Sequence, residues 1–298
     1  MIFSIIMEKR IFEMNNLLET VSWPISFGGK GIKVEINKRY LFTNMVLYGF
    51  GALLPFSMII LLPIFGDLKE WWLSCRMSVD YFGDWSGIVD LFFFCTGPMV
   101  AFTELRQPAL LLYGILKIDL QIFLLNKQIV QLSHDKDIGR FKYQKKIFAK
   151  LRQCTKHHAD LKRCLKEICD LVKVSMPIFL ILGVLGFIAI LYNFLYTLES
   201  ASTITKIRSV YVVVFCAAII GMFSTAGQQI SENTSLVFDT LTNCSWYLWD
   251  KRNKKVLLIF MANSLKPMTF SMYGITLDYQ FALKVWNKSG DFVISEMF

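Results

Sequence analysis

Residues 174–198 read VSMPIFLILGVLGFIAILYNFLYTL and contain no charged residue. A helix of about 20 mostly apolar residues is long enough to cross the hydrocarbon core of a bilayer. Residues 42–65 and 209–230 have the same character. Of all 298 residues, 54% are apolar and 18% are charged, which is more apolar and less charged than an average globular domain. The sequence therefore predicts a membrane protein and excludes a disordered chain.

Two further segments are long enough to span but carry charges. Residues 88–116 include Asp90, Glu104 and Arg106, and residues 267–298 include five charged side chains. Lipid penalises such groups, so we expect both segments to face protein or water. The fold class predicted from these patterns is an all-α polytopic membrane helix bundle, a single transmembrane domain over residues 1–298 with about five spans.

The basic residues indicate how the bundle is oriented. Residues 1–41, 127–173 and 231–266 together hold 24 of the 32 Lys and Arg residues, and these rich segments alternate with poor ones along the chain. Cytoplasmic loops carry the excess of Lys and Arg. We therefore expect the N-terminus to be cytoplasmic and the C-terminus extracellular.

The longest basic segment contains an amphipathic helix that runs toward residue 174. Its apolar stripe has spacings of four and three, which is one face of a helix, and consists of Ile147, Leu151, Cys154, His158, Leu161, Leu165, Ile168 and Val172. Lys and Arg occupy the opposite face. A transmembrane helix is thus predicted to extend well into the cytoplasm, where the stripe packs against other helices.

Motifs of enzymes and metal sites do not emerge from the sequence. It has no phosphate-binding loop, no dinucleotide fingerprint and no nucleophile elbow. His157 and His158 are adjacent and point about 100° apart on a helix, so they do not make a good metal pair. We predict no enzyme, no cofactor, no metal and no nucleic acid, and we interpret the positive charge as a membrane signature.

The C-terminal half resembles the insect odorant receptor family. The similarity lies in the order and spacing of short pieces, each of which has a counterpart in the family: CSWY at residues 244–247, a basic cluster at 251–255, LLIFMANSLKP at 257–267, LDYQF at 277–281 and SGDF at 289–292. The resemblance covers roughly residues 43–298. It implies a multi-pass subunit of a tetrameric ligand-gated cation channel in the plasma membrane of olfactory sensory neurons. Such a subunit binds a small-molecule odorant and assembles with a co-receptor subunit.

The resemblance also implies which residues have which roles. The family's odorant pocket corresponds here to the outer parts of the spans, at Phe56, Met58, Ile59, Phe92, Phe93, Phe94, Tyr192, Phe194, Tyr196, Tyr211, Val214 and Phe215. The family's pore is lined by its last helix, and the apolar gate corresponds to Ile294, Met297 and Phe298. Residues 140–172 and 231–262 correspond to cytoplasmic anchor helices, where subunits meet.

The sequence alone leaves three other interpretations of the protein open. The chain is shorter than typical family members, and its first clear span resembles the family's third, so a truncated, non-functional receptor copy is one alternative. A gustatory-type receptor is another, but Tyr279-Gln280-Phe281 matches the expected motif of its last helix poorly. A membrane transporter or a lipid-modifying enzyme is the third alternative, for which the two adjacent histidines are the single lead.

Overall fold

The computed structural model describes residues 2–24, 33–61, 79–133, 141–192 and 202–297. Its helices are α1 (Ile2–Val21), α2 (Lys33–Leu61), α5 (Ser86–Ser133), α6 (Phe141–Tyr192), α7 (Thr203–Thr242), α8 (Lys251–Ser264) and α9 (Tyr279–Met297). Two short 3-10 turns, η3 (Gly83–Trp85) and η5 (Trp246–Leu248), precede α5 and α8. Within the described ranges the only sheet pairs two-residue strands, β1 (Ser271–Met272) and β2 (Ile275–Thr276). The fold is mostly helical, as predicted.

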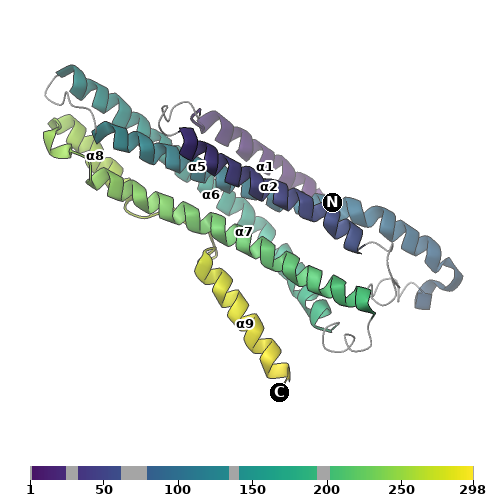
Figure 1. Ribbon diagram of the computed structural model, residues 1–298. Helices are drawn as coiled ribbons and strands as arrows, with labels where there is room; N and C mark the ends of the chain where they lie inside the picture. The colour runs from purple at the N-terminus through teal and green to yellow at the C-terminus, as the bar shows by residue number, and fades with distance from the viewer. Residues whose placement is uncertain (1, 25–32, 62–78, 134–140, 193–201, 298) are drawn as a thin grey trace.

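The long helices form an elongated bundle in which α5, α6 and α7 run alongside one another (Figure 1). The last residues of α2 and α6 and the first residues of α5 and α7 lie at one end of this bundle. The opposite end holds the last residues of α5 and α7, the first residues of α6, and α8. Helix α9 leaves the side of α7 and projects away from the other helices.

The core lies in the half of the bundle that ends at α8. Buried apolar residues of α5, α6, α7 and α8 form one cluster there, and α1 adds Ile11, Met14 and Leu18 to it. The predicted stripe on α6 is confirmed, because its residues from Ile147 to Ile168 are all buried. The basic residues between them, such as Arg152 and Lys162, are exposed. This half is therefore held together like a soluble helical bundle, by burial of apolar surface.

In the half of α7 that begins at Thr203, most apolar residues are not covered by other helices of the chain. Two described segments are long and apolar enough to cross a membrane, Arg106–Leu132 and Thr203–Thr242. In the first, 72% of the most apolar window is buried between neighbouring helices, whereas in the second only 17% is buried. The apolar residues of the first segment are thus used as protein core. Those of α7, such as Ile207, Val210 and Val213, lie on the surface of the chain and require lipid or another subunit to cover them.

The structure corrects the helical span that the sequence predicts over residues 267–298. Residues 271–276 form the β1–β2 hairpin, and the helix begins only at Tyr279. Pro267 disfavours a continuing helix, and Tyr273 and Gly274 both have positive φ, at 47° and 82°, which suits a tight two-residue turn. The Asp278 carboxylate then accepts a hydrogen bond from the Phe281 backbone N–H at 2.8 Å and starts α9.

Three other boundaries also differ from the prediction. The anchor helix expected over residues 231–262 is interrupted after Thr242, and α8 begins anew where the Asp250 carboxylate accepts a hydrogen bond from the Asn253 N–H at 2.7 Å. Helix α5 extends beyond the predicted span of residues 88–116 and continues to Ser133. Helix α1 was not expected, because its apolar residues are interrupted by charges at the start of the chain.

Candidate functional site

The residues that the resemblance assigns to an odorant pocket lie on four helix ends. Phe56, Met58 and Ile59 belong to the last turns of α2, residues 92–94 to the first turns of α5, and Tyr192 is the last residue of α6. Tyr211, Val214 and Phe215 lie on the first half of α7. Phe194 and Tyr196 are outside the described residues. The four helix ends gather at the same end of the bundle (Figure 1).

Some of the described side chains of this set are half-buried, and others lie on the surface of the chain. The rings of Tyr211 and Phe215 are half-buried, with centroids 6.1 Å apart, so they form one aromatic pair on α7. Phe94 is also half-buried. Phe92 is 71% exposed and Val214 is 59% exposed, so within the single chain these two lie on its surface.

The predicted gate residues are at the far end of α9. Ile294 and Met297 belong to the last turns of this helix, and Phe298 lies outside the described residues. Nearer its start, α9 exposes large apolar side chains, among them Leu283 and Trp286. The helix therefore carries an apolar surface that the chain itself leaves uncovered.

A buried polar junction joins α2, α5 and α7 and was not foreseen from the sequence. Asp119 on α5 is buried, and its carboxylate accepts a hydrogen bond from the Asn233 side-chain amide of α7 at 2.5 Å. Arg39 of α2 approaches the same carboxylate at 3.4 Å. Asn126, two turns further along α5, donates to the Asn233 carbonyl at 2.8 Å. The signal in the sequence was an acid inside an apolar run, which marks a position that needs a partner.

The aromatic ring of Phe123 lies at the edge of this junction and contacts two cationic side chains. The Arg39 guanidinium lies 4.2 Å from the Phe123 ring centroid, and the Lys127 ammonium lies 5.0 Å from it. Lys127 also pairs with Glu35 of α2 at 2.8 Å. Ion pairs and cation–π contacts thus attach the first turns of α2 to α5.

The residues on both sides of the hairpin are held against α7 by close contacts. The Thr234 hydroxyl accepts a hydrogen bond from the Met268 backbone N–H at 3.0 Å. At Gly227, a Cβ atom would come within 1.9 Å of the Leu277 carbonyl oxygen, so only glycine allows this approach. At the hairpin turn, the Tyr273 hydroxyl donates to the Lys173 carbonyl of α6 at 3.1 Å. The segment that leads to α9 is therefore fixed to both α6 and α7.

The two adjacent histidines are packed against different aromatic rings. His157 stacks on Trp23 with centroids 3.9 Å apart, and His158 meets the edge of Phe260 at 5.4 Å. Burial lowers the pKa of each imidazole to about 4, with smaller contributions from His158 at the first and from Lys162 at the second. In the part of the chain that the structure describes, no group of His, Cys, Asp and Glu residues could hold a metal ion. Both side chains serve the packing of neutral rings.

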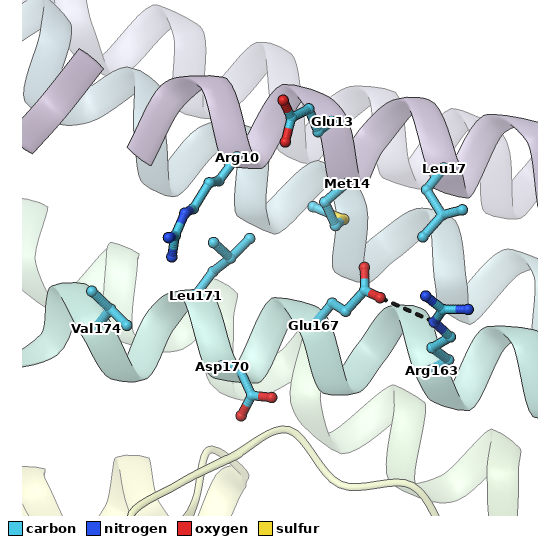
Figure 2. Close-up of a pocket in the computed structure, with 9 residues that line it drawn as sticks. All are labelled: Arg10, Glu13, Met14, Leu17, Arg163, Glu167, Asp170, Leu171 and Val174. Atoms are coloured by element: carbon cyan, nitrogen blue, oxygen red, sulfur yellow. Dashed lines mark hydrogen bonds and ion pairs between the residues drawn. The ribbon is translucent and has the colours of Figure 1, made fainter. Parts of the chain in front are cut away.

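An open groove lies between α1 and α6, well away from the predicted odorant residues. Its volume is about 470 Å³ (Figure 2). The lining combines charged and apolar side chains from the two helices: Arg10, Glu13, Met14, Leu17, Arg163, Glu167, Asp170, Leu171 and Val174. The sequence did not indicate this groove, because α1 itself was not expected.

Comparison with known proteins gives the class of protein. The family model described as 7tm Odorant receptor matches residues 1–287. The chain belongs to this family, and is therefore a membrane protein of a receptor family, not of an enzyme class. The match begins at the first residue, so it includes α1 and extends the resemblance seen in the sequence, which began near residue 43.

Solved structures with the same fold belong to the same class. The insect olfactory receptor OR5 from Machilis hrabei has a TM-score of 0.66 at 12% identity, and the match covers 98% of this chain and 77% of that one. The same receptor in complex with eugenol has a TM-score of 0.63 at 12% identity, covering 90% of this chain and 69% of that one. No curated protein sequence matches the chain.

Proposed function

We propose that this protein is an odorant-binding subunit of a ligand-gated, non-selective cation channel. The observation that carries the proposal is the family match over residues 1–287. The fold similarity to an insect olfactory receptor that binds eugenol supports it. The chain works in a hetero-tetramer with the co-receptor subunit of the family.

The odorant site proposed for this chain lies where the ends of α2, α5, α6 and α7 gather. Aromatic and aliphatic residues supply the contacts, and the Tyr211–Phe215 pair, with centroids 6.1 Å apart, is its best-described part. Volatile odorants are small and apolar, so an apolar, aromatic-lined cavity with few polar groups suits them. Contacts of this kind are weak and non-directional, which favours micromolar affinity and loose selectivity.

Helix α9 is the proposed pore helix, with Ile294, Met297 and Phe298 at the gate. Its exposed Leu283 and Trp286 need a cover, and neighbouring subunits around a central axis provide one. A hydrophobic constriction closes by dewetting and opens when the ring of helices widens. Odorant shifts the population by binding the open arrangement more tightly than the closed one.

The proposed orientation puts the α8 end of the bundle in the cytoplasm. The basic residues of the segments 127–173 and 231–266 belong largely to the elements at that end, and the positive-inside rule favours them there. The candidate odorant residues then lie at the outer end, where α6 finishes and α7 begins. A sensory neuron's plasma membrane is the compartment in which such a subunit works.

The test is odorant-evoked cation current in cells that express this chain with the co-receptor, with an odorant panel applied to each. Current in the pair, but not in cells with either subunit alone, supports the proposal. Silence of the pair, with both subunits detected at the surface and a known receptor responding in parallel, contradicts it.

Variants then locate the site. Tyr211→Ala and Phe215→Ala are expected to raise the half-maximal odorant concentration about tenfold, because each removes an aromatic contact of roughly 1–2 kcal/mol. Tyr247→Ala is the matched control, because this exposed tyrosine lies beside α8 at the opposite end of the chain. Equal effects of all three substitutions would argue against a pocket on α7.

A further inference from the structure

The first turns of α7 have their polar residues inside the chain and their apolar residues outside. Ile207, Val210 and Val214 are each more than half exposed. The buried residues of these turns are Thr205, Arg208 and Ser209. Lipid can cover the apolar surface, but buried polar groups need partners in the interior of the protein.

Arg208 is the residue of this group that most needs an explanation, because it is only 1% exposed. A guanidinium stays protonated in proteins, and a buried charge is costly unless anions or hydrogen-bond acceptors surround it. Arg208 lies in the second turn of α7, directly before the apolar residues 209–230. The N-terminal end of a helix is electropositive, so the dipole of α7 adds to the positive potential there. The start of α7 therefore favours an anion.

The hydroxyl groups beside Arg208 are bonded within α7 itself. The Ser209 hydroxyl donates to the Thr205 carbonyl at 3.1 Å, and the hydroxyls of Ser202 and Thr205 are 3.1 Å apart. Arg208 interacts with other residues of the chain, but its Nη1 atom is buried and makes no hydrogen bond within the described structure. A guanidinium has five N–H donors, so it can bind a ligand in addition to its contacts with the protein.

Arg208 shares a face of α7 with the aromatic residues of the proposed odorant site. Phe215 is seven residues further on, which is roughly 20° around the helix axis and about 10 Å along it. Tyr211, whose ring pairs with that of Phe215, lies between the two. Helical side chains lean toward the N-terminus of their helix, so we expect the guanidinium on the outer side of both rings. The site then has a cation at its outer end and aromatic surface further in.

We propose that Arg208 makes this odorant site selective for carboxylic acids that carry an apolar tail. The carboxylate accepts charge-assisted hydrogen bonds from the guanidinium, and the tail lies against Tyr211 and Phe215. A neutral alcohol of equal length keeps the tail contacts but loses the charge pair. The inference rests on the proposed function, because it names the ligand class of the same site.

The test is equilibrium binding of radiolabelled octanoate and 1-octanol to the purified full chain in phosphatidylcholine nanodiscs, with binding to empty nanodiscs subtracted. The two probes have equal numbers of carbon atoms, and octanoate is ionised at neutral pH. We expect octanoate to bind about tenfold more tightly than 1-octanol. Arg208→Gln is expected to weaken octanoate binding about tenfold, because it removes the charge-assisted pair, and to leave 1-octanol binding within about twofold.

Lys206→Gln is the matched control, because Lys206 is an exposed cation on the same turns of α7. It removes one positive charge and is expected to leave the binding of both probes unchanged. Phe215→Ala is expected to weaken both probes alike, since it removes a contact with the tail.

Three results overturn the inference. The first is equal affinity of the parent chain for octanoate and 1-octanol, and the second is equal binding of octanoate to the parent and Arg208→Gln chains. The third is equal weakening of both probes by Arg208→Gln, which assigns Arg208 a structural role only. Thermal unfolding shows whether each variant is folded, and if Arg208→Gln is not, the comparison of the two probes on the parent chain decides.

The binding measurement needs neither channel opening nor the co-receptor. Current evoked by neutral odorants tests the proposed channel function separately. Such current without selectivity for octanoate overturns this inference alone, whereas selective binding without any current contradicts the channel function alone.

Discussion

The side-chain amide of Asn233 donates a hydrogen bond to the carboxylate of Asp119 at 2.5 Å and so joins α7 to α5 in the interior of the bundle. Both residues are buried, at 6% exposure each. Asn233 also accepts a hydrogen bond from Asn126 through its backbone carbonyl. These hydrogen bonds form between buried groups, so Asp119 and Asn233 are each costly to remove alone.

Removal of this junction is the first prediction. Asp119→Ala is expected to lower the free energy of unfolding by about 3 kcal/mol, because it leaves the Asn233 amide buried without its acceptor. Arg39→Gln is the control, since Arg39 is 36% exposed and its pair is worth about 1 kcal/mol or less. The measurement is denaturant unfolding of the purified chain in detergent. In a double-mutant cycle, Asp119→Leu with Asn233→Leu should cost less than the sum of the two single changes, and simple additivity would contradict the junction.

Gly227 gives a prediction about the hairpin. A Cβ at this position meets the Leu277 carbonyl oxygen, so Gly227→Ala must push the segment before α9 away from α7. We expect a loss of about 2 kcal/mol, in the range for overpacking of a close contact. Gly221→Ala on the same helix is the control: nothing lies within 4 Å of its added Cβ, so it should be neutral or slightly stabilising. Thermal midpoints of the two variants provide the comparison, and equal midpoints would contradict the close approach.

The buried histidines predict a dependence of stability on pH. Their pKa values in the folded chain are about 4, below the ordinary value of 6.5, so between these two values the unfolded chain binds more protons. The free energy of unfolding is therefore expected to fall as pH decreases from 6.5 to 4, by on the order of 3 kcal/mol at most for each histidine. Above pH 6.5 this contribution is fully present.

Substitution of one ring isolates the effect from that of carboxylates. His157→Phe keeps an aromatic ring against Trp23 but removes a titrating group whose Nε2 atom has no hydrogen-bond partner in the described structure. Unfolding curves of the variant, measured at intervals between pH 7 and pH 4, should show a smaller pH slope than the parent chain. Identical slopes would mean that His157 does not titrate in this way.

The joint between α6 and α8 gives the fourth prediction. Asn253 is fully buried, and its side-chain amide donates to the backbone carbonyl of Gln144 at 3.0 Å and to its side-chain oxygen at 2.8 Å. Asn253→Ala is expected to cost about 2 kcal/mol, because two hydrogen bonds to Gln144 are lost and its side-chain oxygen keeps only the Asp250 backbone N–H as a donor. The matched control is Asn263→Ala, which removes an exposed asparagine from the same helix and should change stability by about 0.5 kcal/mol or less. Urea or thermal unfolding distinguishes the two, and similar losses would contradict the role of this joint.

Much of the fold could be predicted from local pattern. The α6 stripe from Ile147 to Ile168 was read from the spacing of apolar residues, and all of its positions are buried. The family was also recognisable from the order of short motifs, which the match over residues 1–287 confirms. The odorant and gate residues rest on that resemblance and stay predictions.

The sequence by itself determined that the apolar stretches within α2, α5, α6 and α7 are helical, because periodicity and hydropathy depend on residues within a few positions of one another. Only the tertiary structure decided that α1 packs on α5 and α6, that residues 271–276 form a hairpin, and that a charged groove opens beside Leu171. The same holds for Asn233 and Asp119, which are 114 residues apart in the chain. Contacts of this kind have no local signature, since they exist only after separate helices have docked in one register.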